Sequence, residues 1–154
     1  MENFRNQLPK ENDRKNFQKK FADNLFLYTY ESQFGVSETM SKLEQNIKSK
    51  EIPIFAIFDH GMNAEKAGLK LHPNQVIVFG SPQVGTILMQ ENPAISIELP
   101  LRISVWEDDK GKVWITFPNL RSIGERYNIQ NSPVIEKMHK LLLDLAIKSA
   151  INNR

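Results

Sequence analysis

Residues 101–118 read LRISVWEDDKGKVWITFP, and this stretch predicts a β-hairpin. Both halves alternate apolar with other residues, which is the two-residue period of a strand. The apolar set consists of Leu101, Ile103, Val105, Val113, Ile115 and Phe117. A three-residue loop, 109–111, with Gly111 in the left-handed conformation, keeps this set on one face of the hairpin. The same register places Trp106 opposite Trp114 on the other face.

Further elements are predicted on the N-terminal side of this hairpin. Alternating or continuous apolar runs predict strands over residues 25–30, 52–58 and 76–79, the last two as central strands covered on both faces. Ser37 is the predicted cap of a helix that ends near Lys50. Short helices are expected around residues 63–69 and, with Thr86 as its cap, around 86–91.

On the C-terminal side, Ser132 and Pro133 predict the start of a helix of about five turns. The expected fold is therefore a two-layer α+β sandwich with a mostly antiparallel sheet of about five strands. The main elements follow the order β-α-β-β-β-β-α, with short helices between strands. Two main helices cover one face of a sheet, while these strands are apolar on both faces, so we expect a homodimer.

Composition limits the classes of function. The chain has 154 residues, which suits a single core, and no cysteine, so disulfides and thiolate metal sites are excluded. A net charge of +2 and the lack of a long apolar run indicate neither a nucleic-acid nor a membrane partner, and a cytoplasmic location is expected. Residues 1–22 form a mildly basic extension, with a short helix expected around Phe17 and Phe21. Residues 23–154 form the domain.

A series of turn-forming and small polar residues between the strands carries a family resemblance. It includes Asp59-His60, Ala64, Ala67-Gly68, Leu71, Pro73, Phe79-Gly80, Pro82, Gly85-Thr86, Leu88-Met89, Asn92-Pro93 and Leu99-Pro100. In their joint order these residues resemble the domain-of-unknown-function 302 family over roughly residues 25–120. Ser81 and Ile87 depart from the family pattern, which tends to have Asn and Pro there. The resemblance implies a two-layer α+β fold and often a dimer, but no catalytic residues.

His60 is the candidate catalytic residue, as a general acid or base at the end of a predicted strand. Adjacent strand residues point to opposite faces, so Asp59 is expected to cap the following helical turn rather than to orient His60. Spacing between His60 and His72 fits no compact zinc pattern, and we predict no metal. No motif indicates a particular cofactor.

A second candidate lies at residues 79–86, which resemble a strand, a loop with two glycines and a helix start. The amides of such a loop can bind a phosphate or carboxylate, although a plain turn with a helix cap explains the pattern too. It lacks the ending of a nucleotide-binding loop and the spacing of a dinucleotide fold.

Three functions follow from these candidates. The first is a homodimeric binding module for a small polar or anionic ligand, because both polar turns follow consecutive strands and are expected at one edge of the sheet. Its predicted ligand-binding residues are His60, Gly80, Ser81, Gly85, Thr86 and Gln90. The second is an enzyme in which His60 transfers a proton and Arg102 or Thr86 stabilises charge. The third is a structural or interaction role in which the central segment forms a subunit interface.

Overall fold

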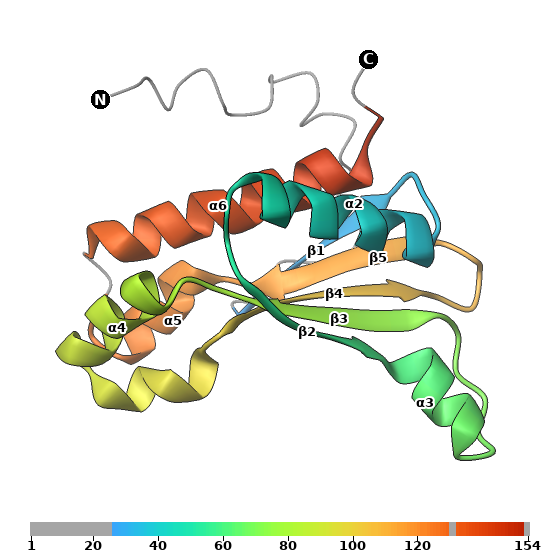
Figure 1. Ribbon diagram of the computed structural model, residues 1–154, viewed down its shortest axis with the longest axis horizontal. Coiled ribbons are helices and arrows are strands. Elements are labelled where there is room, and N and C mark those ends of the chain that lie inside the picture. Colours follow the sequence, from blue (N-terminus) through green and yellow to red (C-terminus); the bar gives the residue numbers. More distant parts are fainter. Residues whose placement is uncertain (1–25, 130–131, 153–154) are drawn as a thin grey trace.

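The computed structural model describes residues 26–129 and 132–152, which form a two-layer α+β sandwich (Figure 1). The extension predicted for residues 1–22, with its helix around Phe17 and Phe21, lies outside the described residues. In chain order the elements are β1 (Leu27–Ser32), α2 (Val36–Ser49), β2 (Ile54–Asp59), α3 (His60–Lys66), β3 (Asn74–Phe79), α4 (Pro82–Glu91), the 3₁₀ helix η2 (Pro93–Glu98), β4 (Leu101–Glu107), β5 (Val113–Pro118), α5 (Leu120–Arg126) and α6 (Pro133–Ala150).

The five strands form one sheet in the order β1-β5-β4-β3-β2, and each neighbouring pair is antiparallel. The expected fold class and the order of the main elements are therefore confirmed. One strand differs from its predicted role. β2 is an edge strand, although its continuous apolar run predicted a central one, because such a run reports only local burial. Phe55 and Phe58 on this strand are about half exposed.

The hairpin of β4 and β5 has the predicted register. Asp108 and Lys112 close a three-residue loop with a backbone hydrogen bond of 2.8 Å, and Gly111 has φ = 78°. Only glycine adopts that conformation at little cost. Trp106 lies opposite Trp114, with ring centroids 6.3 Å apart. The predicted tryptophan pair is thus present on the face away from the aliphatic stripe.

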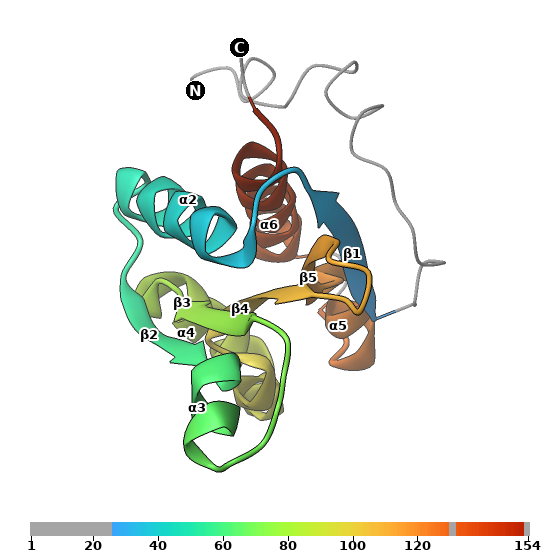
Figure 2. The same ribbon diagram turned by 90° about the vertical axis from the view of Figure 1, so that its right-hand side faces the viewer.

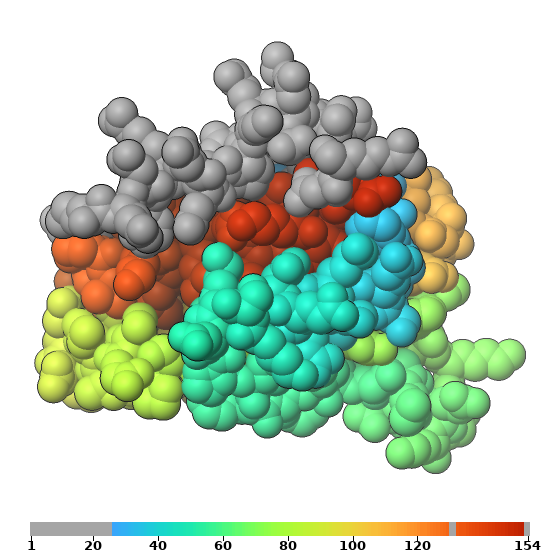
Figure 3. Space-filling model, turned by 45° about the horizontal axis from the view of Figure 1, so that its top comes forward, coloured from blue at the N-terminus to red at the C-terminus, as the bar shows by residue number. Residues whose placement is uncertain are grey.

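The core lies between the sheet and the two long helices. α2 and α6 pack side by side on one face of the sheet (Figures 2 and 3). Their inward side chains, including Leu43 and Leu142, are fully buried against strand residues such as Ile77 and Ile103. α3 lies at one end of the sheet, and α4, η2 and α5 lie at the other end, where α4 and α5 also contact α6 (Figure 1). Among the described elements, no helix lies over the middle of the sheet face opposite α2 and α6.

Helix starts are where local prediction was least accurate. α2 begins at Val36, with Gly35 rather than Ser37 at the N-cap position. α4 begins at Pro82, so Thr86 is inside the helix, where its hydroxyl donates to the Pro82 carbonyl at 2.6 Å. α5 was not predicted. The cap of α6 was predicted correctly, since the Ser132 hydroxyl accepts from the Val134 amide at 3.3 Å.

Candidate functional site

The open face of the sheet is built by strand alternation. One row of paired residues crosses all five strands on this face, from edge to edge. It consists of Phe58, Val76, Ser104, Thr116 and Thr29. Residues between these positions along each strand point to the helices instead, as Ile77 and Ile115 do. The row is apolar at the β2 side and carries hydroxyl groups toward β1.

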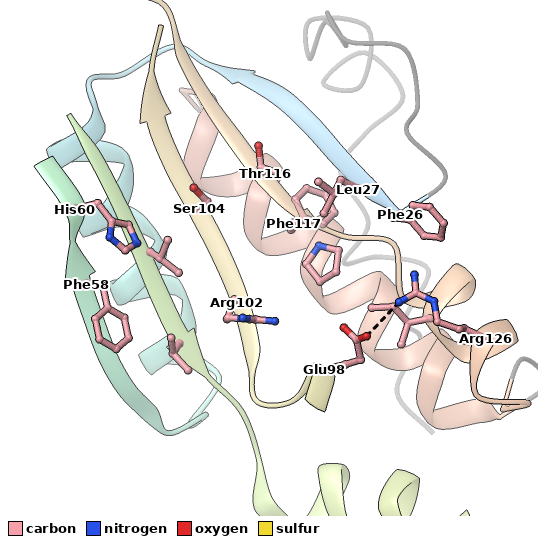
Figure 4. A pocket seen from close by; sticks show the side chains of 14 residues that line it. Phe26, Leu27, Phe58, His60, Glu98, Arg102, Ser104, Thr116, Phe117 and Arg126 are labelled. Atoms are coloured by element: carbon pink, nitrogen blue, oxygen red, sulfur yellow. Dashed lines mark hydrogen bonds and ion pairs between the residues drawn. The ribbon is translucent and has the colours of Figure 1, made fainter. Parts of the chain in front are cut away.

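A pocket of about 490 Å³ lies on this face and extends toward η2 and α5 (Figure 4). Pockets of roughly 300–1,000 Å³ hold small organic ligands. The lining residues are Phe26, Leu27, Phe58, His60, Val76, Val78, Glu98, Arg102, Ser104, Thr116, Phe117, Pro118, Ile123 and Arg126. Most of them are apolar, and the charged side chains are few.

Arg102 is exposed and projects from β4 into this pocket (Figure 4). The acidic residue of the lining, Glu98, is engaged elsewhere: its Oε1 accepts from Nη1 of Arg126 at 3.2 Å and from the Tyr127 hydroxyl at 3.1 Å. Within residues 26–129 and 132–152, no carboxylate lies at ion-pair distance from Arg102. The pocket therefore presents one positive charge that Glu98 does not neutralise.

The ion pair between Glu98 and Arg126 also fixes the pocket wall that η2 and α5 form. The Arg126 guanidinium lies 4.8 Å from the centre of the Phe26 ring, within the range of a cation–π contact. Desolvation raises the pKa of Tyr127, and its hydrogen bond to the Glu98 carboxylate raises it further, so the hydroxyl stays a donor at neutral pH. These contacts hold α5 and η2 together at the end of the sheet.

Hydroxyl groups line the floor between β4 and β1. Thr116 Oγ1 accepts from the Trp106 indole N–H at 2.9 Å and lies 3.0 Å from Thr29 Oγ1. Ser104 is the direct strand neighbour of Thr116. These groups offer a bound molecule neutral hydrogen-bonding partners beside the Arg102 charge.

His60 lines the pocket at the β2 side. It is exposed, and its ring stacks on Phe58 with centroids 6.5 Å apart. Asp59 does not orient it: the carboxylate accepts from the Met62 amide at 2.9 Å and from the Gln75 side chain at 3.3 Å. The prediction that Asp59 caps the following helix is confirmed. The described part of the chain contains no group of three or more histidine, aspartate or glutamate side chains that could hold a metal ion.

The other predicted ligand residues lie at the opposite end of the sheet. β2 and β3 are antiparallel, so the end of β2 that leads to His60 pairs with the start of β3, and Gly80 follows the other end. At about 3.4 Å per residue, a six-residue strand separates the two ends by roughly 17 Å. The expectation that the two turns open at one edge was wrong, because consecutive antiparallel strands end at opposite edges of the sheet.

The Gly80–Thr86 segment is also not a loop. Ser81 is at the N-cap position of α4 and donates to the Gln83 side chain, while Gly85 and Thr86 lie within the helix. The Gly85 amide donates to the Ser81 carbonyl at 3.0 Å, so it is already engaged. Gln90 is exposed near the end of the same helix. Whether any of these residues contacts a ligand stays a prediction.

Sequence reasoning named Arg102 only as a possible helper of His60 and missed most of the pocket. The alternation of residues 101–106 does place Arg102 and Ser104 on the face away from the aliphatic stripe, so this signal was present. No comparable signal existed for Glu98 and Arg126, because they meet through tertiary packing across 28 residues of chain.

The sequence matches the model of a family described as a domain of unknown function, DUF302, over residues 28–145. This chain belongs to the DUF302 family. A crystal structure of an uncharacterized conserved DUF302 protein from Bacillus stearothermophilus is similar to this DUF302 chain, with a TM-score of 0.72 and 20% identity. The similarity covers 82% of this chain and 99% of that one. At this identity it supports the fold alone.

Curated relatives come from Brucella species. "Fluoride-specific ion channel FluC 1" of Brucella suis and the protein of the same name from Brucella abortus are each 41% identical over 103 residues. That region is 67% of this chain but only 41% and 38% of the two relatives, so the DUF302 chain spans about two fifths of their length. In the described residues of this chain, no helix has both the length and the apolar composition needed to cross a membrane.

Proposed function

We propose that this chain is a homodimeric small-ligand-binding module whose site is the open face of the sheet around Arg102. The observation that carries the proposal is the exposed Arg102 guanidinium in an apolar pocket whose only lining carboxylate among the described residues is paired with Arg126. The planar guanidinium of an arginine favours a carboxylate or phosphate, which it can bind through two parallel hydrogen bonds.

The walls of the pocket indicate the rest of the ligand. Val76, Val78 and Phe58 form an apolar surface beside Arg102. A hydrated inorganic anion gains nothing from such a surface, whereas each buried CH₂ contributes about 0.8 kcal/mol. The best match is an organic anion with an apolar body, whose carboxylate or phosphate meets Arg102 and whose apolar part lies over β3 and β2.

Octanoate is a suitable probe, with octanol as the uncharged comparison, and isothermal titration calorimetry measures both. We expect octanoate to bind more tightly than octanol. Arg102→Gln should weaken octanoate binding by about 10- to 100-fold, because a hydrogen bond to a charged group contributes roughly 1.5–3 kcal/mol. The same variant should leave octanol binding unchanged.

Arg121→Gln is the matched control, because Arg121 is an exposed arginine on α5 that pairs with Glu136 and does not line the pocket. Equal octanoate affinities for the two variants would refute the site. Sodium fluoride is a third probe, since the curated relatives are named as fluoride channels. If fluoride binding depends on Arg102 and octanoate does not bind, the ligand of this site is a halide and not an organic anion.

The enzyme alternative has less support. It requires a second titratable group within hydrogen-bond reach of His60. Among the residues that the structure describes, the ring contact of His60 is with Phe58, and its neighbour Asp59 is engaged with Met62 and Gln75. In the proposed binding site, His60 is therefore a polar side chain of the pocket and not a general acid or base.

A further inference from the structure

Exposed apolar surface is concentrated on β2, α3 and the loop that follows. Of the ten large hydrophobic residues that are exposed in the described part of the chain, six lie in this region. They are Phe55 (55% exposed), Ile57 (40%), Phe58 (49%), Met62 (52%), Leu69 (66%) and Leu71 (51%). Exposed apolar patches rimmed by polar residues mark interaction surfaces.

β2 adds an unpaired backbone edge to this surface. Among the described strands it pairs with β3 alone, so its other side presents N–H and C=O groups in the spacing of a strand. Natural edge strands are protected by charged residues, prolines or bulges; Pro53 precedes β2, but no charge occurs between Pro53 and Asp59. The register irregularity is confined to Ile54–Ala56, and pairing from Ala56 to Asp59 is regular.

We propose that a second copy of this chain pairs antiparallel with β2, about a twofold axis through Ile57, so that two five-stranded sheets become one continuous sheet. This deepens the homodimer of the proposed function but does not depend on the ligand. In an antiparallel pair, two residues that lie directly opposite each other project their side chains to the same face of the sheet. The position of the twofold axis along β2 therefore decides which side chains of the two copies meet. An axis at Ile57 places Phe58 against Ala56 of the partner subunit, a large side chain beside a small one.

Charge and packing favour this occupant and this register. With the axis at Ile57, the two Asp59 carboxylates lie roughly 14 Å apart, at about 3.4 Å per residue, so like charges do not meet. An axis at Phe58 would place Asp59 opposite an isoleucine, and one at Ala56 would use the irregular residue Phe55. Because α3 follows β2 directly, this register places the start of α3, with the exposed Met62, next to the start of the strand from the second copy.

The first test is sedimentation velocity of the full chain. We expect the wild type to be a dimer and Ile57→Lys to be a monomer, since two lysines would meet on the axis. The control is Ile97→Lys, which changes a residue that is 74% exposed on η2, away from β2, and should stay dimeric. A monomeric wild type, or a dimer that survives Ile57→Lys, would overturn the proposal.

A cysteine variant provides a second test, because misfolding of Ile57→Lys would also abolish the dimer. The chain contains no cysteine, so Ile57→Cys introduces one thiol per copy. Opposite Cα atoms in an antiparallel pair lie about 4.5–5.5 Å apart, within the range of a disulfide. Mild oxidation should give an inter-subunit disulfide with Ile57→Cys and none with Ile97→Cys; equal yields would contradict the register. Arg102→Gln should remain a dimer, which separates failure of the ligand proposal from failure of this one.

Discussion

His139 is a buried imidazole on α6 that contacts the Tyr28 ring, with centroids 5.9 Å apart. Burial lowers its pKa from the usual value of about 6.5, and the positive charge of Arg121 lowers it further. The Glu136 carboxylate acts in the opposite direction, but it is itself hydrogen-bonded to Arg121. The folded protein therefore favours the neutral form of this side chain.

We expect the protein to lose stability as the pH falls below about 6.5, the pKa of histidine in an unfolded chain. There the unfolded state binds a proton that the folded state resists, so the free energy of unfolding declines until the lower folded pKa is reached. His139→Phe should reduce the slope of melting temperature against pH between about pH 7 and pH 5. His72→Asn, a change at an exposed histidine, should keep the wild-type slope. Identical slopes in all three proteins would contradict this.

At the level of elements, α5 closes the end of the pocket and was not predicted. Its start is fixed by Asn119, whose side-chain oxygen accepts from the amides of Arg121 at 3.1 Å and Ser122 at 3.3 Å. α5 has only seven residues, and helices this short depend on caps and tertiary contacts. The pocket residues Ile123 and Arg126 are held in place by this helix.

Asn119→Ala should lower the free energy of unfolding by about 0.5–2 kcal/mol, because two amides lose their partner. Ser81→Ala is the matched control. Ser81 is also at an N-cap position, on α4, but its side chain makes no capping hydrogen bond. Chemical denaturation measures both variants, and equal losses would show that the Asn119 cap contributes nothing specific.

At the scale of the molecule, α2 and α6 cover one face of the sheet, and the opposite face, as far as the described residues show, carries the pocket. Stability comes from the covered face, where Leu142 of α6 is fully inaccessible among residues of α2 and the sheet. The open face carries the pocket and exposes apolar surface toward β2. Core and candidate sites are thus segregated to opposite sides of the same strands.

Leu142→Ala should cost about 2–5 kcal/mol, since it removes buried methyl groups and leaves a cavity that the packed helices cannot fill. That is a large fraction of the roughly 5–15 kcal/mol that holds a typical domain folded. Ile97→Ala, at a highly exposed position, should change stability by less than about 0.5 kcal/mol. Thermal or urea unfolding checks both values, and a small effect at Leu142 would place the core elsewhere.

Sequence alone determined the strands, the register of the β4–β5 hairpin, the Ser132 cap and the family, because all of them depend on local periodicity, turn chemistry and residue order. Tertiary structure decided that β2 is an edge strand and that antiparallel pairing with β3 sends His60 and Gly80 to opposite ends of the sheet. It also brought Glu98 and Arg126 together beside Arg102. The physical reason is that alternation assigns a residue to a face, whereas strand order and direction are fixed by packing between segments distant in the chain.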